Sequence, residues 1–297
     1  MHNSPAMPPR TKLILSRKGF DSAHGGCPSP ILDGDLLCSL PIPDDRSSIR
    51  YRQISFNGSG VATIVESLTR GRISGTACAH LDPDLRRDAI RRAPGWRPIF
   101  GQAGAAQSHL ARNQVGVGDL FLFFGSFQRA ETDGNTLRFV RSAPKLHVIF
   151  GWLEVGAVHP VTNTLAAKIP WARQHPHLTA PNRYKRNTVY LASKHLSSLD
   201  LDSPGAGVFE RLRPELILTE TNPYQGCANW KLPQWLHPGQ RTPLSYHQNP
   251  TRWTKDAESV HLKSAYPGQE FVLDLNQYPE AFGWLRRIFR SCESARA

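Results

Sequence analysis

Apolar residues occur in short runs along this chain, and most of these runs have the spacing of β-strands. Alternating or continuous apolar stretches bounded by Gly, Pro or polar residues predict strands at 12–16, 51–56, 119–124, 147–155, 188–192, 216–219 and 270–273. The stretches 119–124 and 147–155 are apolar at nearly every position, and Asp133-Gly134-Asn135 between them is typical of a hairpin turn. We therefore expect this pair at the centre of a sheet or barrel.

Three other stretches have patterns typical of helices. Residues 85–92 follow Asp82, an N-cap candidate, with Pro83 in the first helical position. Residues 105–112 follow a run of small residues, and the apolar residues of 282–289 share one face at helical spacing. The last of these helices is expected to close a core.

The elements are many and short. Gly and Pro number 23 and 24 of the 297 residues and are spread through the chain, which excludes a long helical bundle. Neither an internal repeat nor an extended linker is visible. We predict one integrated α+β domain at 11–297, with a mixed or barrel-like central sheet and short helices, preceded by a disordered tail at 1–10.

The charge of the chain favours a polyanionic partner. Lys and Arg total 36 and Asp and Glu total 24, which gives a formal net charge of +12. Such a surplus attracts nucleic acid, although it also keeps a protein soluble. Five Cys residues without a Cys-x-x-Cys pair make a disulfide framework or structural zinc knot improbable, and the absence of a long apolar run argues against membrane insertion. The expected location is the cytoplasm.

A loop after the first predicted strand combines hydroxyls, cations and glycines. Such a loop can bring backbone amides and positive charge to a phosphate, and a surface turn is the alternative. The small residues that open the helix at 105–112 offer a second anion site, with close helix packing as the alternative. We assign nucleotide binding to Ser16, Arg17, Lys18, Gly25, Gly26, Ser29, Gly104 and Gln107.

An imidazole and two carboxylates lie together in His80-Leu81-Asp82-Pro83-Asp84. They suit an acid/base or metal-ligand pair, but a helix cap also explains Asp82 and leaves only His80 without a role. Glu270, beside Gln269, starts a late strand, and exposure at a strand edge is its simpler interpretation. The candidate catalytic residues are Asp21, His80, Asp82, His109 and Glu270, and no metal ligand is assigned.

Aromatic and basic residues are interleaved in two Pro-interrupted stretches, 170–186 and 244–253. Rings and cations together suit bases and phosphates of a single strand, with pocket walls or edge packing as the alternatives. The His175 and His177 pair could bind a metal ion, but without an obvious third ligand plain polar surface is the simpler interpretation. The nucleic-acid-binding candidates, with Trp152 added from the central strand, are Trp152, Trp171, Arg173, His177, Arg183, Lys185, Arg186, His247, Arg252 and Trp253.

Several of these motifs together resemble a known bacterial family. Ser-Arg-Lys-Gly-Phe-Asp-Ser at 16–22 and the segments 25–31, 80–85, 104–107, 118–125, 147–153, 204–209 and 268–274 are similar to the third nucleotide modification associated domain family, over roughly residues 12–284. The resemblance implies a role in bacterial and phage systems that modify DNA bases, without an assigned reaction. The paired central strands are also similar to those of PUA-related barrels, which bind RNA or modified bases.

The sequence thus favours an enzyme, or an enzyme component, that acts in nucleic-acid base modification. It would bind a nucleotide and a polyanionic nucleic acid, with DNA favoured over RNA, and no membrane. No cofactor and no oligomeric state is assigned. Two other hypotheses remain open, a non-catalytic reader of modified bases and an ADP-ribosyl or glycosyl transferase that acts on nucleic acid.

Overall fold

A ten-stranded mixed sheet forms the centre of the computed structural model, which describes residues 11–134, 136–265 and 270–293. The predicted tail at 1–10 lies outside the described residues. The strands of the sheet are β1 (Lys12–Arg17), β2 (Ser29–Leu32), β3 (Leu36–Leu37), β8 (Ile99–Gln102), β9 (Leu120–Asp133), β10 (Thr136–Phe139), β11 (Leu146–Pro160), β12 (Thr188–Ala192), β13 (Ala206–Val208) and β17 (Glu270–Asp274).

The main path of the sheet has the order β17-β1-β9-β11-β12-β8. Strand β1 is parallel to β9 and antiparallel to β17, while β9, β11, β12 and β8 are successively antiparallel. The mixed sheet, the predicted hairpin and the single α+β unit are therefore confirmed. Among the described residues the sheet does not close into a barrel.

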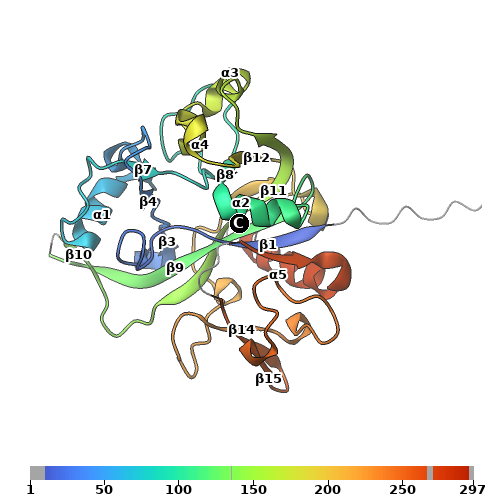
Figure 1. Cartoon of the computed structure of the whole chain (residues 1–297). Helices are drawn as coiled ribbons and strands as arrows, with labels where there is room; N and C mark the ends of the chain where they lie inside the picture. Colours follow the sequence, from blue (N-terminus) through green and yellow to red (C-terminus); the bar gives the residue numbers. More distant parts are fainter. Residues whose placement is uncertain (1–10, 135, 266–269, 294–297) are drawn as a thin grey trace, which may run out of the picture.

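In the described part of the chain, three small sheets and five α-helices accompany this central sheet, and Figure 1 shows their arrangement around it. The small sheets consist of β14 (Asn229–Pro233), β15 (Trp253–Lys255) and β16 (Ser259–Lys263), of β4 (Ile42–Pro43) and β7 (Ala79–His80), and of β5 (Ser55–Phe56) and β6 (Ser59–Gly60). The helices are α1 (Val61–Thr69), α2 (Gly104–Arg112), α3 (Leu165–Lys168), α4 (Pro176–Thr179) and α5 (Glu280–Glu293).

Single turns of 3-10 helix connect many of the elements. They are η1 (Asp33–Asp35), η2 (Tyr51–Gln53), η3 (Pro170–Ala172), η4 (Pro181–Arg183), η5 (Ser197–Leu199), η6 (Pro214–Leu216), η7 (Gln234–Leu236), η8 (Pro250–Arg252) and η9 (Leu275–Gln277). Within the described residues, no helix has both the length and the apolar character needed to cross a bilayer.

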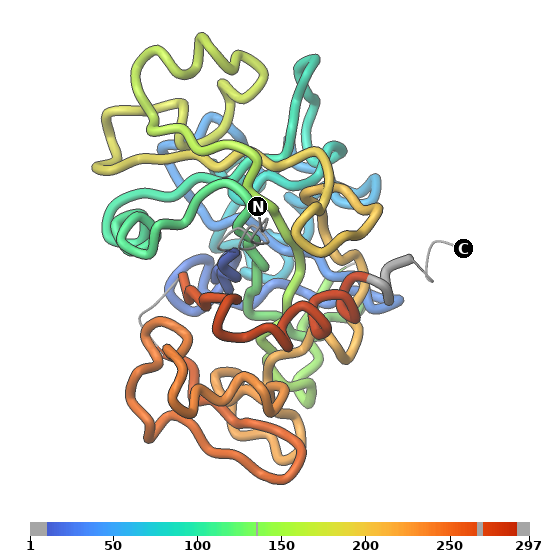
Figure 2. The backbone as a smooth tube through the Cα atoms, turned by 90° about the vertical axis from the view of Figure 1, so that its right-hand side faces the viewer, coloured from blue at the N-terminus to red at the C-terminus, as the bar shows by residue number. Residues whose placement is uncertain are grey.

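The apolar runs of β9 and β11 form the core because both faces of these strands are covered. Phe121, Phe123 and Phe124 are fully buried, and Phe100 of β8 makes edge contacts with the first two. The tube view shows α5 crossing between the sheet and the β14–β16 lobe (Figure 2). The predicted helices at 105–112 and 282–289 are confirmed.

The helix predicted at 85–92 does not form, and the polar groups at its two ends make other hydrogen bonds. The backbone of Asp84 pairs with that of Ile99 on β8, and the buried Asp84 carboxylate accepts two bonds from Arg92, at 2.7 and 2.5 Å. Asp82 does not act as a helix cap, since its side chain accepts the amide of Gly101 instead. These tertiary bonds replace the i to i+4 ladder.

Two predicted strands are also wrong. Residues 51–56 divide into η2 and β5, because the Arg50 amide donates to the Gln53 side chain and closes a turn. Residues 216–219 begin in η6, whose first residue is Pro214, and make only isolated bridges at Ile217 and Thr219. Apolar runs this short fit strands and buried turns equally well.

Buried histidines fix the β14–β16 lobe in place. Trp230 of β14 donates its indole N–H to His147 Nδ1 at 2.9 Å, and burial lowers the pKa of His147 to about 3. His247 Nε2 accepts the Ala265 amide at 2.9 Å while its Nδ1 donates to the Ser245 carbonyl, and burial lowers its pKa to about 4. Both rings are therefore neutral parts of the framework near pH 7.

These two histidines predict an acid-sensitive stability. An unfolded His gains a proton below about pH 6.5, but the folded rings stay neutral until about pH 3 and pH 4, so stability falls as the pH drops through that range. Replacing His247 with Gln should reduce the slope of unfolding free energy between pH 6.5 and 4 by up to about 1.4 kcal/mol per pH unit. Urea unfolding at several pH values measures this slope.

The exposed His195 supplies the control, because His195→Gln should leave the slope at its wild-type value. Equal slopes for wild type, His147→Gln and His247→Gln would show that neither buried ring resists protonation.

Candidate metal centre

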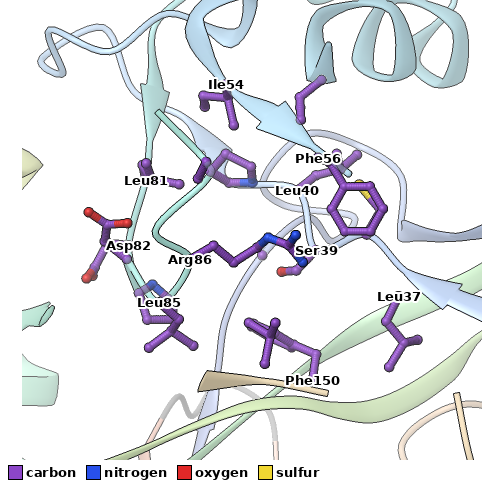
Figure 3. Close-up of a pocket in the computed structure, with 18 of the residues that line it drawn as sticks. Leu37, Ser39, Leu40, Ile54, Phe56, Leu81, Asp82, Leu85, Arg86 and Phe150 are labelled. Carbon is purple, nitrogen blue, oxygen red and sulfur yellow. The ribbon is translucent and has the colours of Figure 1, made fainter. Parts of the chain in front are cut away.

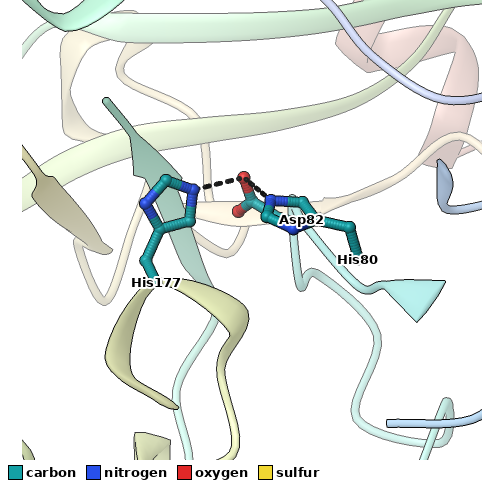
Figure 4. A group of neighbouring side chains, drawn as sticks. All are labelled: His80, Asp82 and His177. Atoms are coloured by element: carbon teal, nitrogen blue, oxygen red, sulfur yellow. Dashed lines mark ion pairs between the residues drawn. The ribbon is translucent and has the colours of Figure 1, made fainter. Parts of the chain in front are cut away.

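Three side chains from two separate segments meet at the edge of the main sheet (Figure 4). His80 ends β7, Asp82 follows two residues later, and His177 lies in the single turn of α4. One ligating atom from each residue lies within 4.8 Å of those of the other two. This set is called the His80–Asp82–His177 cluster below.

The sequence around α4 explains why His177 points inward. Pro176 suits the first position of a helical turn, and the side chain of His175 caps that turn by accepting the His177 amide. Leu178 packs in an apolar cluster with Ile99 of β8 and Val189 of β12. This packing holds α4 over β8, beside Asp82.

Glycine is required on β8 for this close approach. A Cβ atom at Gly101 would lie 2.3 Å from Cδ2 of His177, closer than any real contact. The Gly101 amide also donates to Asp82 Oδ1 at 2.8 Å. Gly101 thus makes space for one member of the cluster and fixes another.

The imidazoles present the same nitrogen to the same oxygen. Nε2 of His80 and Nε2 of His177 each lie 3.7 Å from Asp82 Oδ2. The other oxygen, Oδ1, is already occupied by the Gly101 amide and by His175 Nε2 at 3.1 Å. The three remaining donor atoms therefore face one common point.

The far nitrogen of each ring is held by an oxygen acceptor. His80 Nδ1 lies 2.8 Å from Asp44 Oδ2, and His177 Nδ1 lies 2.6 Å from Asn187 Oδ1. Because both partners accept, each Nδ1 carries the proton and each Nε2 is directed at the cluster. Metal-binding histidines are usually oriented in this way, by an acceptor at the second ring nitrogen.

The electrostatics give the members different protonation states. Burial disfavours charge on His80, but its hydrogen bonds to Asp44 and Asp82 outweigh burial and raise its pKa to about 9. Burial lowers the pKa of His177 to about 4. Burial also opposes charge on Asp82, yet bonds from His175 and His80 hold its pKa well below the usual range. Near pH 7 the cluster thus contains an ionised Asp82 carboxylate, a neutral His177 and a protonated His80, whose Nε2 proton a bound metal ion would displace.

Two imidazoles and one carboxylate form a donor set that suits divalent transition metals such as zinc or iron. Three protein ligands leave coordination positions open, the property that separates catalytic metal sites from closed structural ones. The residues present therefore fit a bound metal ion whose remaining coordination positions would be taken by other ligands.

The structure identifies members of this site that the sequence analysis did not select. His175, Asp44 and Asn187 position the cluster, although only the His175-Pro-His177 spacing signalled any of them in the sequence. His175 and His177 are buried, so their interpretation as polar surface is wrong. Tyr184 stacks on His177 with ring centroids 5.2 Å apart and covers its outer side.

Residues of the predicted phosphate loop form a second polar group. Lys18 Nζ and Gln102 Nε2 both donate to Glu270 Oε1, at 2.7 and 2.5 Å. Glu270 is only 1% exposed, so the expectation of an exposed strand edge is wrong. Its Oε2 and the Oγ of Ser16, its cross-strand neighbour, have no partner among the described residues. Gln102 follows Gly101 on β8, which places this group next to the metal centre.

The rest of that loop has clear structural contacts. Asp21 accepts the amides of Ala23 and His24 and lies 3.2 Å from Arg17. Gly25 and Gly26 have φ values of +87° and +76°, in the left-handed region that glycine favours, and a Cβ at Gly25 would clash with the Phe20 ring. Ser29 Oγ accepts the Leu40 amide. Nucleotide binding by this loop stays a prediction.

Helix α2 uses its predicted residues in contacts with its neighbours. The Gly104 amide donates to the Lys185 carbonyl, and Gln107 Oε1 accepts the Tyr190 hydroxyl. His109 Nε2 lies 2.9 Å from Ser245 Oγ. The Gly104 amide, which the sequence analysis predicted to bind an anion, is therefore already bonded to a carbonyl group.

The predicted nucleic-acid contacts divide by exposure. The side chains of Trp152, His247 and Trp253 are buried in packing contacts, so a base could reach them only after those contacts open. Trp171 packs at the edge of an apolar cluster, and Arg252 donates to the Lys263 carbonyl. Four cations of the segment that supplies His177 are exposed, namely Arg173, Arg183, Lys185 and Arg186.

A cavity of about 70 Å³ lies on the other side of the Asp82 backbone (Figure 3). Its wall is mostly apolar, and Arg86 extends among the labelled side chains while the Asp82 carboxylate points away. Gly19 of the phosphate loop also lines this cavity. The loop and the His80–Asp82 segment are therefore neighbours in the fold.

Comparison with known proteins identifies one family. The model of a family described as nucleotide modification associated domain 3 matches residues 12–274, most of the chain. The resemblance expected from the sequence motifs is thereby confirmed. Neither the curated proteins nor the solved structures that were searched contain a match.

The geometry predicts one divalent metal ion per chain. Titrating chelator-treated protein with Zn²⁺, Mn²⁺ or Fe²⁺ in calorimetry should give a stoichiometry of one, and His177→Ala should abolish it because one of three ligands is lost. Asn187→Ala keeps all three ligands but releases the His177 ring, so affinity should fall about 10- to 100-fold.

His195→Ala is the matched control, since this exposed imidazole lies outside the cluster and its loss should leave affinity unchanged. A folded wild type that takes up none of these ions, or a His177→Ala variant that binds them as tightly, would contradict the assignment.

Proposed function

Because this chain belongs to the nucleotide modification associated domain 3 family, we propose that it is a metal-dependent enzyme of a nucleic-acid base modification system. The observation that carries the proposal is the convergence of His80 Nε2, His177 Nε2 and Asp82 Oδ2, each directed by a separate hydrogen-bond partner. Metal ligands that are oriented by hydrogen bonds from neighbouring residues are typical of catalytic metal centres.

A bound divalent ion would supply Lewis acidity, either to a substrate oxygen or to a coordinated water. The residues around the cluster would hold the ligand atoms in place and determine which ring nitrogen carries a proton. Asp44 and Asn187 keep the Nδ1 protons of both rings away from the metal side, and His175 with Gly101 keeps Asp82 Oδ1 occupied. The carboxylate then has one oxygen for the metal.

Exposed cations around the centre support a polyanionic substrate. Arg173, Arg183 and Lys185 lie in the same chain segment as His175 and His177, and Arg46 lies over the Tyr184 ring that covers His177. Together with the net charge of +12, these side chains would draw the backbone of a nucleic acid toward the cluster. We propose DNA as that nucleic acid.

The enzyme hypothesis predicts a chemical product that depends on Asp82. Wild type and Asp82→Asn should be produced in a bacterial host that lacks the gene, and the nucleosides of digested DNA and of the nucleotide pool compared by mass spectrometry. A modified nucleoside should be present with wild type and reduced at least tenfold with Asp82→Asn, because a metal ligand is lost.

His195→Ala serves as the control and should match wild type. A reader module without catalysis would instead bind modified DNA equally well as wild type and as Asp82→Asn and leave every nucleoside unchanged, and that result would exclude the enzyme hypothesis.

The exposed cations Arg173, Arg183, Lys185 and Arg186 predict that DNA binding weakens as the salt concentration rises. Each lost phosphate contact lowers the slope of log affinity against log salt by about 0.9 on duplex and about 0.7 on single-stranded DNA. Arg183→Ala should show this reduction in fluorescence anisotropy titrations at several salt concentrations. Arg138→Ala should not, because Arg138 is an exposed cation on β10, outside the segment that supplies His177. An affinity that does not change with salt would contradict electrostatic binding.

A further inference from the structure

Tyr246 is an exposed aromatic residue in a backbone conformation that side chains other than glycine seldom adopt. Its φ is +66°, and its side chain remains 41% exposed. For a bulky residue, a left-handed backbone costs free energy, and such outliers concentrate where a side chain must be held for a ligand. Tyr246 therefore exposes its ring from a backbone conformation of higher free energy than most surface residues adopt.

The ring of Tyr246 is held rigidly from below. Its centroid lies 4.4 Å from that of His109 on α2, with the planes inclined at 37°. His109 is itself fixed by Ser245 Oγ, and the edge of Phe271 contacts Tyr246 from β17. His109 and Phe271 contact Tyr246 while much of its side chain remains exposed, so a further planar group can stack on the exposed part of the ring.

The cationic side chain of Arg186 contacts α2 at the residue before His109. Arg186 donates to the hydroxyl of Ser108 at 2.6 Å, and Ser108 immediately precedes His109. Arg186 is exposed and also has a left-handed backbone, with φ of +53°. A cation and an aromatic ring thus contact successive residues of α2.

The same surface leads directly to the metal centre. Arg186 precedes Asn187, whose side chain orients His177, and the carbonyl of the exposed Lys185 accepts the first amide of α2. Figure 1 shows α2 below α4, which carries His177. A chain of direct contacts therefore connects Tyr246, α2, Arg186 and the metal ligands.

We infer that the surface formed by Tyr246, Lys185 and Arg186 beside α2 guides a single-stranded nucleic acid to the metal centre, with a base stacked on Tyr246 and the backbone phosphates on Lys185 and Arg186. This inference rests on the proposed function and adds the strand type and the contact residues. The bases of a duplex are already stacked on each other and offer no free face, whereas an unpaired base does. Alternating rings and cations are the usual means of holding single strands.

The decisive experiment compares Tyr246 with Tyr224, the other exposed tyrosine in the part of the chain that the structure describes. Anisotropy titrations with a fluorescent DNA single strand and with the matching duplex should be run on wild type, Tyr246→Ala and Tyr224→Ala. Loss of one stacked base should weaken single-strand binding by Tyr246→Ala about 5- to 150-fold and duplex binding by less than about 3-fold. Tyr224 is 43% exposed, but its hydroxyl donates to the backbone carbonyl of Lys145. Tyr224→Ala should therefore bind both forms of DNA as wild type does.

Two further variants separate stacking from folding and from hydroxyl chemistry. Tyr246→Phe keeps the ring and should retain single-strand affinity. Tyr246→Gly suits the left-handed backbone, so it should remain folded while it loses affinity as the alanine variant does. Equal single-strand affinity of Tyr246→Gly and wild type, or equal weakening of single strand and duplex, would overturn the inference. If wild type bound neither form of DNA, the polyanion part of the proposed function would fail instead.

Discussion

The geometry of the site depends on the buried carboxylate of Asp82. An ionised carboxylate inside a protein must be matched by donors or cations, since leaving it unmatched costs several kcal/mol. The chain supplies these partners from three segments, with His80 beside it, Gly101 on β8 and His175 with His177 at α4. One oxygen is satisfied by hydrogen bonds, and the other is left to two imidazole nitrogens.

This requirement organises the segment between β11 and β12. Pro170, Pro176 and Pro181 each begin a single helical turn, so the segment folds back over β8 instead of extending from the sheet. Its histidines point inward while its cations remain exposed. One short, Pro-interrupted stretch therefore contributes both His177 of the His80–Asp82–His177 cluster and four exposed cations.

Strand β8 connects the two polar groups of the molecule. Gly101 donates its amide to Asp82, and Gln102, the next residue, donates its side chain to Glu270. Successive residues of a strand point to opposite faces, so β8 can serve the metal centre and the Lys18–Glu270 pair at the same time. The aromatic core under β9 and β11 makes this strand edge rigid.

Sequence alone determined the parts of this protein that depend on local pattern. The apolar runs at 119–124 and 147–155, the small-residue start of α2 and the amphipathic C-terminal helix were predictable because burial imposes their spacing. The family and the candidacy of His80 and Asp82 were visible in short motifs.

The tertiary structure decided which partner each polar residue takes. Asp82 resembled a helix cap in the sequence, but in the fold Gly101 and His175 hydrogen-bond to its carboxylate. Tyr246 lay within the aromatic and basic stretch 244–253, but its exposure and its contact with His109 depend on distant segments. Hydrogen bonds and ring contacts between such segments leave no periodic trace in the sequence, so only the folded chain could reveal them.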